Sequence, residues 1–563
     1  MLVRKSIWAL ALTTLFAVVT FAQSQPSGNA SPSSATPVAP ATSAPDTHLD
    51  STRPTSLNQL LDRIIKREHD QITLISLYRP IVETYIQEIK RDKEMGFVPS
   101  HDYYYLGQAD LARGISEKSI LPKKSFGAYI PPGFLESAYV DRYHFDKQHY
   151  QFQYAGRTFL GDVRCWMFDV TPLPKAGKQL FSGRIWVEDQ NYTIVRFNGV
   201  FLPQRSFLGL NAHFDSWREN VQPDLWLPAL IFSQELTKKG YGENPFRGQT
   251  RFWGYRLGGV HHEAEFSDIL VDSPAVQDDS TTAQDKTPVE AERMWEQEAE
   301  ENTVDTLVRD GLIAPEGPVD KVLNTVLNNL IVTNNLNIEP EPRCRVLLTS
   351  NIEAFSLNHT IVLSRGLLDV LPDEATLAVV IAGQLSDALV PKLAEEQYGF
   401  ADRLQVPTKK ALREFSFKDS RDDWQATGEK AIALLRNSPY RNELATAGLF
   451  LKQLSLSSKS LPHLISPNLG NRIYPVAELL NAGQQLAPGD VKQVPALPLG
   501  ARIKLDPWTN EIELVKSHGP ALQSAREKEP LQITPFMPYL TRYSERKAVS
   551  QPASTTTSGG GEK

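Results

Sequence analysis

The predicted folded part of the chain begins near Ser56, where apolar residues recur every three or four positions. The residues in this series are Leu57, Leu60, Leu61, Ile64 and Ile65. Charged residues lie between them, so the spacing predicts an amphipathic helix.

From about Tyr103 to Val271 the period changes to two, and aromatic and β-branched residues become frequent. Short turn sequences interrupt this pattern. One of them, Asp189-Gln190-Asn191, separates two alternating stretches and predicts an antiparallel hairpin. We therefore expect the helix to pack into one large, strongly curved antiparallel sheet with an apolar concave side.

The second half of the chain returns to helical spacing. Apolar residues lie three and four apart over 289–336 and 424–456, and a short strand is predicted at 344–350. A further helix is predicted over 373–389, and 501–516 reads as a closing hairpin that turns at Asp506. The predicted buried stripe of the helix over 373–389 consists of Leu377, Ile381, Leu385 and Leu389. The fold class is therefore α+β, with a sheet domain followed by a mostly helical domain.

Three stretches contain almost nothing that could be buried, and we predict that they are disordered. They separate the chain into regions. The predicted regions are a signal peptide at 1–22, a linker at 23–55, the sheet domain at 56–270, a second linker at 271–288, the helical domain at 289–545 and a tail at 546–563.

The first 22 residues have the features of an export signal. Arg4 and Lys5 precede an apolar run that is short for a membrane span and that ends at Thr20-Phe21-Ala22. Cleavage would leave Gln23 as the first residue of a periplasmic or secreted protein without a transmembrane segment. The alternative is an uncleaved N-terminal anchor.

The net charge, the cysteines and the histidines indicate which partners and metal sites to expect. The formal net charge is -7 and no long Lys/Arg stripe occurs, which argues against a nucleic-acid partner. The only two cysteines, Cys165 and Cys344, fall in different predicted domains and are expected to be buried free thiols. Among the eleven His, the one dense cluster is His261-His262-Glu263 with Glu265, which is conceivable as a metal site but more typical of a solvated strand face.

Several residues of the helical domain follow a specific order. Asn351, Ala354 and Phe355 come after the strand at 344–350, a Gly-Leu-Leu segment occupies 366–368, and the helix over 373–389 begins with two acidic residues. This order resembles the HtpX/BepA-type zinc metallopeptidases of bacterial envelopes over about 290–480. The resemblance implies a zincin-like domain with a small edge sheet, in which Asn351, Ala354 and Phe355 form the edge strand of a cleft.

The resemblance also implies which positions would carry the chemistry. In the family, two His on one helix face and an acidic residue from a second helix bind Zn²⁺, and a Glu beside the first His activates water. Here Gly383 and Asp387 stand at the His positions, Gln384 at the catalytic Glu, and Trp424 at the ligand on the second helix, where a shift of one residue would place Asp423 instead. Glycine has no ligand atom and an amide cannot accept a proton. We therefore expect no zinc, no other cofactor and no catalytic residue, so the chain is not expected to be an enzyme.

The sheet domain resembles a second group of proteins. Its N-terminal helix and the strand ending in Trp186-Val187-Glu188 are similar to LolA/RseB-like envelope proteins. That resemblance implies a lipid or lipoprotein ligand in the sheet. The expected function is an exported envelope protein whose inactive peptidase frame binds or scaffolds an envelope client. The alternative is an active metallo-endopeptidase with substitute ligands.

Overall fold

A computed structural model gives the fold. The residues that it describes are 56–93, 96–111, 116–120, 132–202, 212–235, 245–255, 288–388, 424–465, 467, 469–470, 473, 497, 499–500, 502–515, 531–535 and 537–543. The predicted signal peptide, the linker at 23–55, most of the linker at 271–288, the tail and the cluster around His261 lie outside them.

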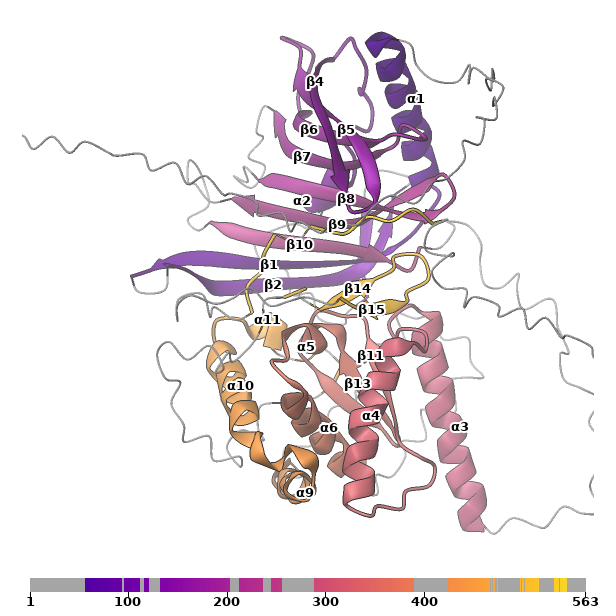
Figure 1. Ribbon diagram of the computed structural model, residues 1–563, viewed down its shortest axis with the longest axis vertical. Coiled ribbons are helices and arrows are strands. Elements are labelled where there is room, and N and C mark those ends of the chain that lie inside the picture. The colour runs from indigo at the N-terminus through magenta and orange to yellow at the C-terminus, as the bar shows by residue number, and fades with distance from the viewer. Residues whose placement is uncertain are drawn as a thin grey trace, which may run out of the picture. The chain divides into compact units, whose positions relative to one another are not determined.

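In the N-terminal half, the described residues form one long helix and ten strands, with two short helical turns between the third and fourth strands (Figure 1). These elements are α1 (Leu57–Ile75), β1 (Ile81–Asp92), β2 (Gly96–Asp110), β3 (Ser116–Ser119), α2 (Pro132–Leu135), η1 (Glu136–Ala138), β4 (Tyr150–Leu160), β5 (Val163–Pro172), β6 (Leu180–Glu188), β7 (Ile194–Leu202), β8 (His213–Gln222), β9 (Leu225–Glu235) and β10 (Phe246–Trp253).

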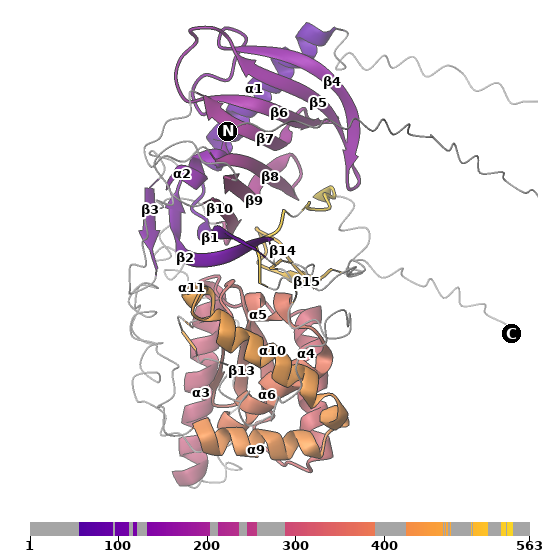
Figure 2. The ribbon, with the colours of Figure 1, turned by 90° about the vertical axis from the view of Figure 1, so that its left-hand side faces the viewer.

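The ten strands form a single sheet in the order β3-β2-β1-β10-β9-β8-β7-β6-β5-β4. Every neighbouring pair is antiparallel, and Figure 2 shows how strongly the sheet bends. The hairpin predicted around Asp189 is confirmed, because β6 pairs with β7 through Val187 and Ile194. The predicted helix followed by a curved antiparallel sheet is therefore confirmed.

Helix α1 lies against one face of this sheet. Its buried apolar residues pack with the aromatic side chains that face it, among them Phe168, Phe181, Phe197 and Phe214. Gly183 and Gly199 lie opposite each other on β6 and β7, and a Cβ atom on either would come within 2.8 Å of the Phe181 ring. The two glycines thus let an aromatic ring lie flat on the backbone. The predicted apolar face is present, and the described side chains on it form a core with α1.

The C-terminal half is mostly helical. Its elements are α3 (Pro288–Arg309), α4 (Pro318–Thr333), β11 (Arg343–Leu347), β12 (Ala354–Leu357), β13 (Thr360–Ser364), α5 (Arg365–Val370), α6 (Glu374–Ala388), α9 (Trp424–Arg436), η3 (Pro439–Asn442), α10 (Leu444–Ser457), α11 (Pro462–Ile465), β14 (Ile503–Leu505) and β15 (Ile512–Leu514). The predicted closing hairpin is β14–β15, and Asp506 caps its turn by accepting the N–H groups of Trp508 and Thr509.

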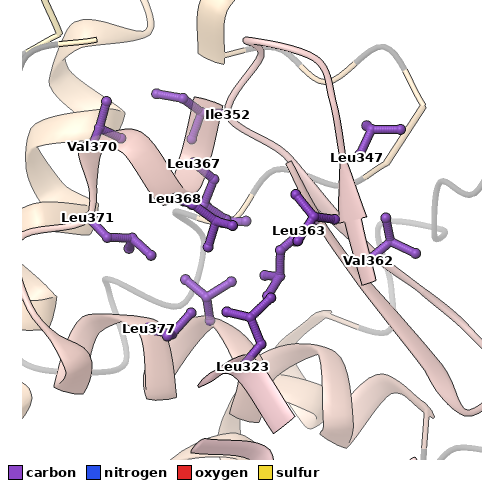
Figure 3. Close-up of a cluster of buried hydrophobic side chains, with 14 of the residues drawn as sticks. Leu323, Leu347, Ile352, Val362, Leu363, Leu367, Leu368, Val370, Leu371 and Leu377 are labelled. Atoms are coloured by element: carbon purple, nitrogen blue, oxygen red, sulfur yellow. The ribbon is translucent and has the colours of Figure 1, made fainter. Parts of the chain in front are cut away.

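A three-stranded sheet lies at the centre of this half. Its order is β11-β13-β12, so β12 is at an edge, and β12 is antiparallel to β13 whereas β11 is parallel to it. Leucine and valine side chains from this sheet, α4, α5 and α6 pack together in Figure 3. The same hydrophobic cluster includes Ile81, Tyr104 and Trp253 of the large sheet, so both halves contribute to it.

Residues 531–535 and 537–543 lie along the outer face of the large sheet, opposite α1, and we call them the strap. Gln87 of β1 exchanges hydrogen bonds with the backbone of Leu531 and Ile533. Further on, Leu540 packs into a cluster with Trp186, Trp217 and Trp226, and Arg542 donates to Glu188. The strap therefore covers part of the face that α1 leaves open. Among the described helices, none is both long enough and apolar enough to span a bilayer.

Candidate functional site

Helix α6 carries the residues that the sequence singled out. Asp373 accepts hydrogen bonds from the backbone N–H and hydroxyl of Thr376 and so caps the helix, which satisfies a donor that would otherwise be unpaired. Leu377, Ile381 and Leu385 are buried as predicted, while Leu389 lies outside the described residues. Ala378 and Ala382 are also fully buried among them, so the neighbouring elements approach α6 closely.

Gly383, Gln384 and Asp387 lie beside this stripe. Among the described residues, no atom outside the backbone of α6 itself lies within 4 Å of the place that a Cβ on Gly383 would occupy. Gln384 is 9% exposed, and its Oε1 has no hydrogen-bond partner among the described residues. An unpaired polar group in such a position costs about 1–3 kcal/mol. Asp387 accepts a hydrogen bond of 2.6 Å from the Ser356 hydroxyl on β12.

This set of side chains does not fit the zinc site of the resembling family. A glycine, an amide and one carboxylate supply at most one anionic ligand, whereas catalytic zinc sites use three protein ligands. Across the described ranges, no group of three or more His, Cys, Asp or Glu could hold a metal ion. Trp424 is the first residue of α9, which packs against α6. The structure describes the backbone of Trp424 but not its side chain.

The predicted cleft strand is packed against a later part of the chain. Asn351, Ala354 and Phe355 are all fully buried, and the Asn351 amide donates to the backbone oxygen of His463 at 2.6 Å. A Cβ on Gly470 would lie 2.7 Å from the Phe355 ring, so only glycine permits this approach. Glu353 holds the same segment by accepting the N–H groups of Leu469 and Gly470. Ser356, further along β12, is the residue of this strand that reaches α6.

Buried carboxylates connect the large sheet to the helices. Glu83 of β1 accepts hydrogen bonds from the Tyr104 hydroxyl, from the backbone and hydroxyl of Ser350, and from Arg365 at 2.9 Å. Arg365 also reaches Asp369 at 3.2 Å. Asp369 in turn accepts the N–H groups of Arg502 and Ile503. All these carboxylates are nearly inaccessible to water.

Asp102 of β2 forms the second connection. It accepts from the Tyr85 hydroxyl, from the backbone N–H groups of His463 and Leu464, and from the His463 ring at 3.0 Å. The hydrogen bond to Asp102 raises the pKa of His463, and burial opposes it. We call the contacts of Glu83, Asp102, Asp369, Arg365, Ser350 and His463 the sheet–helix joint. The joint was not predicted from the sequence. The sign available there was a carboxylate within a strand, as at Glu83 and Asp102.

Two further places on the large sheet could take part in binding. Under α1, Arg218 makes two hydrogen bonds of 2.7 Å to Glu68, and both side chains are fully buried. On the outer face, a groove of about 500 Å³ lies over β5 to β8. Arg184 and Asp169 form a two-bonded pair along it, and Asn198 and His213 also line it.

Comparison with solved structures gives several matches that each cover about a third of this chain. No protein-family model and no curated protein matches the chain. A LolA superfamily protein from Nitrosomonas europaea is 10% identical with a TM-score of 0.21 and covers 36% of this chain and 96% of its own. A putative outer membrane lipoprotein-sorting protein domain from Vibrio parahaemolyticus is 9% identical with a TM-score of 0.22 and covers 37% and 95%.

A third similar structure is the MucA/MucB complex of Pseudomonas aeruginosa, with 8% identity, a TM-score of 0.12 and coverage of 34% of this chain and 92% of that one. Similarity at these TM-scores does not identify a ligand or partner of this chain. The fold of the sheet is given by its own strand order and register.

Proposed function

We propose that this chain is an exported binding protein of the cell envelope, in which a peptidase-like frame has lost its chemistry. The observation that carries the proposal is the contrast within α6. The described residues of the buried stripe are packed as predicted, whereas at the adjoining positions no described neighbour approaches a Cβ at Gly383, the Gln384 Oε1 has no described partner, and Asp387 accepts a hydrogen bond. Packing residues suffice to keep a helix folded when catalysis is no longer selected.

In this proposal the helical half binds or scaffolds an envelope client without hydrolysing it. The test is to assay casein hydrolysis and zinc content in the wild-type protein and in Gln384→Ala. We expect neither stoichiometric zinc at α6 nor chelator-sensitive proteolysis in either protein. Chelator-sensitive hydrolysis by the wild type would overturn the proposal and favour the alternative, a metallo-endopeptidase with substitute ligands.

We further propose that the border of the apolar face under α1, where Phe201 is only partly buried, binds an acyl chain of a lipid or lipoprotein. Support comes from its aromatic lining and from the sequence resemblance to LolA/RseB-like proteins, because burial of apolar area contributes about 25 cal/mol per Å². Phe201 is partly buried at the border of this face, where it stacks on Phe214.

The experiment measures binding of a fluorescent fatty acid to the full chain. Phe201→Glu is expected to weaken binding at least about tenfold, since it introduces a charge on the apolar surface. Phe159→Glu is the matched control, because Phe159 is exposed on the edge strand β4. No saturable binding by the wild type, or equal losses in both variants, would contradict acyl binding at this face.

Export is the third part of the proposal. The charged start, the short apolar run and the Thr20-Phe21-Ala22 boundary support cleavage by a signal peptidase. N-terminal sequencing of protein recovered from the periplasm or the medium should begin near Gln23. Retention of Met1 in the membrane fraction would instead show an uncleaved anchor.

A further inference from the structure

The connection between η1 and β4 contains the same four-residue unit twice. In the first, Asp141 Oδ1 accepts the backbone N–H groups of Tyr143 and His144, both at 2.9 Å. In the second, Asp146 Oδ1 accepts those of Gln148 at 2.8 Å and His149 at 2.9 Å. Each aspartate thus folds the next three residues back on itself, so that a histidine side chain lies beside its carboxylate.

The two imidazoles that result are close neighbours. Their ring centroids are 5.0 Å apart. Nδ1 of His149 is 2.8 Å from Asp146 Oδ1, and Nδ1 of His144 is 3.8 Å from Asp141 Oδ1. At His149 the hydrogen-bonded carboxylate favours the tautomer with its proton on Nδ1, which leaves the lone pair on Nε2, whereas the 3.8 Å at His144 is too long for a hydrogen bond. Histidines that bind metals are usually oriented by a carboxylate in this way.

Buried aromatic residues hold the backbone that carries these rings. Phe145, between the two units, is fully buried in the core under α1, and Tyr150 packs beside it. The Tyr150 hydroxyl donates to the outer oxygen of Asp141. Lys147 ties the same segment to the start of α1 through an ion pair of 2.6 Å with Asp62. The connection is therefore held on a packed layer, as a preformed binding site requires.

Both histidines remain accessible to a ligand from solution. The side chain of His144 is 53% exposed and that of His149 is 26% exposed. Tyr143 stands next to His144 and is itself mostly exposed. The feature is thus a surface pair of imidazoles, each with its own carboxylate, outside both the α6 face and the apolar face under α1.

We propose that His144 and His149 bind one divalent transition-metal ion through their Nε2 atoms, with Asp146 orienting the His149 ring, Asp141 holding the backbone of His144 and water completing the coordination. Imidazole nitrogen suits Cu²⁺, Ni²⁺ and Zn²⁺, and the affinity of such sites is highest for Cu²⁺. The described residues add no third ligand of the His, Cys, Asp or Glu type, so the ion is exchangeable. The site is independent of the proposed function, because it uses no residue of α6.

The test titrates the metal-free full chain with Cu²⁺ and, separately, with Zn²⁺, and follows binding by calorimetry. The wild type should bind about one ion at this pair, and His144→Ala and His149→Asn should each weaken it at least about tenfold. The asparagine can still donate to Asp146, which keeps the local fold. The Cu²⁺ form should show two nitrogen ligands by electron paramagnetic resonance, and Cu²⁺ should quench the fluorescence of Tyr143.

The control replaces both His261 and His262 by alanine, because these residues form the other cluster of histidines in the sequence. Binding that survives this double substitution and is lost in His144→Ala confirms the site. Binding that is unchanged in both His144→Ala and His149→Asn, or that disappears only in the double variant, overturns it. Circular dichroism of each variant shows whether a loss of binding reflects a loss of fold.

Discussion

The sheet–helix joint and the Gly383–Asp387 face of α6 both bury polar side chains, but the joint gives its carboxylates several partners each. Glu83 and Asp102 each accept four hydrogen bonds from named groups, two of them from backbone N–H in the case of Asp102. On α6, Gln384 Oε1 and Ser386 Oγ are buried and have no partner in the part of the chain that the structure describes. Both regions belong to the same compact unit.

The difference indicates what each region is for. A buried charge with all its hydrogen bonds made holds its partners in one arrangement. Its removal leaves the opposite charge buried without a partner, which destabilises the fold. An unpaired buried amide does not stabilise the fold, so it marks either a binding surface or a position released from an earlier constraint. Polar burial alone therefore does not identify a functional site; the number of partners separates the two cases.

Of the substitutions that test this comparison, one at Glu83 is expected to have the largest effect on the free energy of unfolding. Glu83→Gln removes the charge that Arg365 faces at 2.9 Å and should lower the free energy of unfolding by about 3–5 kcal/mol. Urea denaturation measures it. Asp169→Asn, which disrupts the exposed pair with Arg184, is the matched control and should cost no more than about 1 kcal/mol. Equal effects of the two variants would remove the distinction between the joint and a surface ion pair.

A smaller effect is expected from protonation of His463. Its pKa is raised in the folded state by the hydrogen bond to Asp102, so the folded protein holds this proton more tightly than the unfolded chain does. The extra stability is fully present below the unfolded pKa of about 6.5 and is lost as pH rises through the folded pKa.

The measurement compares wild type with His463→Asn between about pH 5 and 8, around the unperturbed histidine pKa. Because the ring is about one-third exposed, the pH-dependent difference should stay within about 1 kcal/mol. A difference that grows toward high pH would mean that Asp102 does not favour the imidazolium.

The smallest effect is expected on α6. Gln384→Met keeps the shape of the side chain and removes an unpaired oxygen, so the free energy of unfolding should stay the same or rise by about 1 kcal/mol. Urea denaturation again measures it, with Leu385→Ala, in the fully buried stripe, as the destabilising reference. A loss of 2 kcal/mol or more, on the order of a buried hydrogen bond to a charge, would show that Gln384 has a partner.

The sequence predicted the parts of the fold that depend on periodicity. Helical spacing placed α1 and α6, and alternation with a turn at Asp189 placed the β6–β7 hairpin. It did not predict that Gln87, Asp102 and Glu83 would hold segments hundreds of residues away, because such pairing depends on tertiary contacts that leave no local pattern.

The candidate sites were predictable to different degrees. The absence of zinc-ligand side chains at Gly383 and Gln384 was evident from the residue types alone, whereas the surroundings of Gly383 and the hydrogen bond from Ser356 to Asp387 required coordinates. The histidine pair could have been noticed from the spacing Asp-x-x-His, which occurs at 141–144 and again at 146–149. Its significance lies in the 5.0 Å between the rings, which the spacing does not give.

The central claim, a peptidase frame without its chemistry, is tested most directly by zinc stoichiometry in a His144→Ala background, which removes the proposed surface site. Plasma mass spectrometry would compare this protein with one that also carries Gly383→His, Gln384→Glu, Asp387→His and Trp424→Glu. We predict no stoichiometric zinc with the native α6 and about one equivalent after the four substitutions, since they supply the ligands of a zinc site and no described atom outside the α6 backbone lies within 4 Å of a Cβ at Gly383. Stoichiometric zinc and chelator-sensitive casein hydrolysis with the native α6 would contradict the claim.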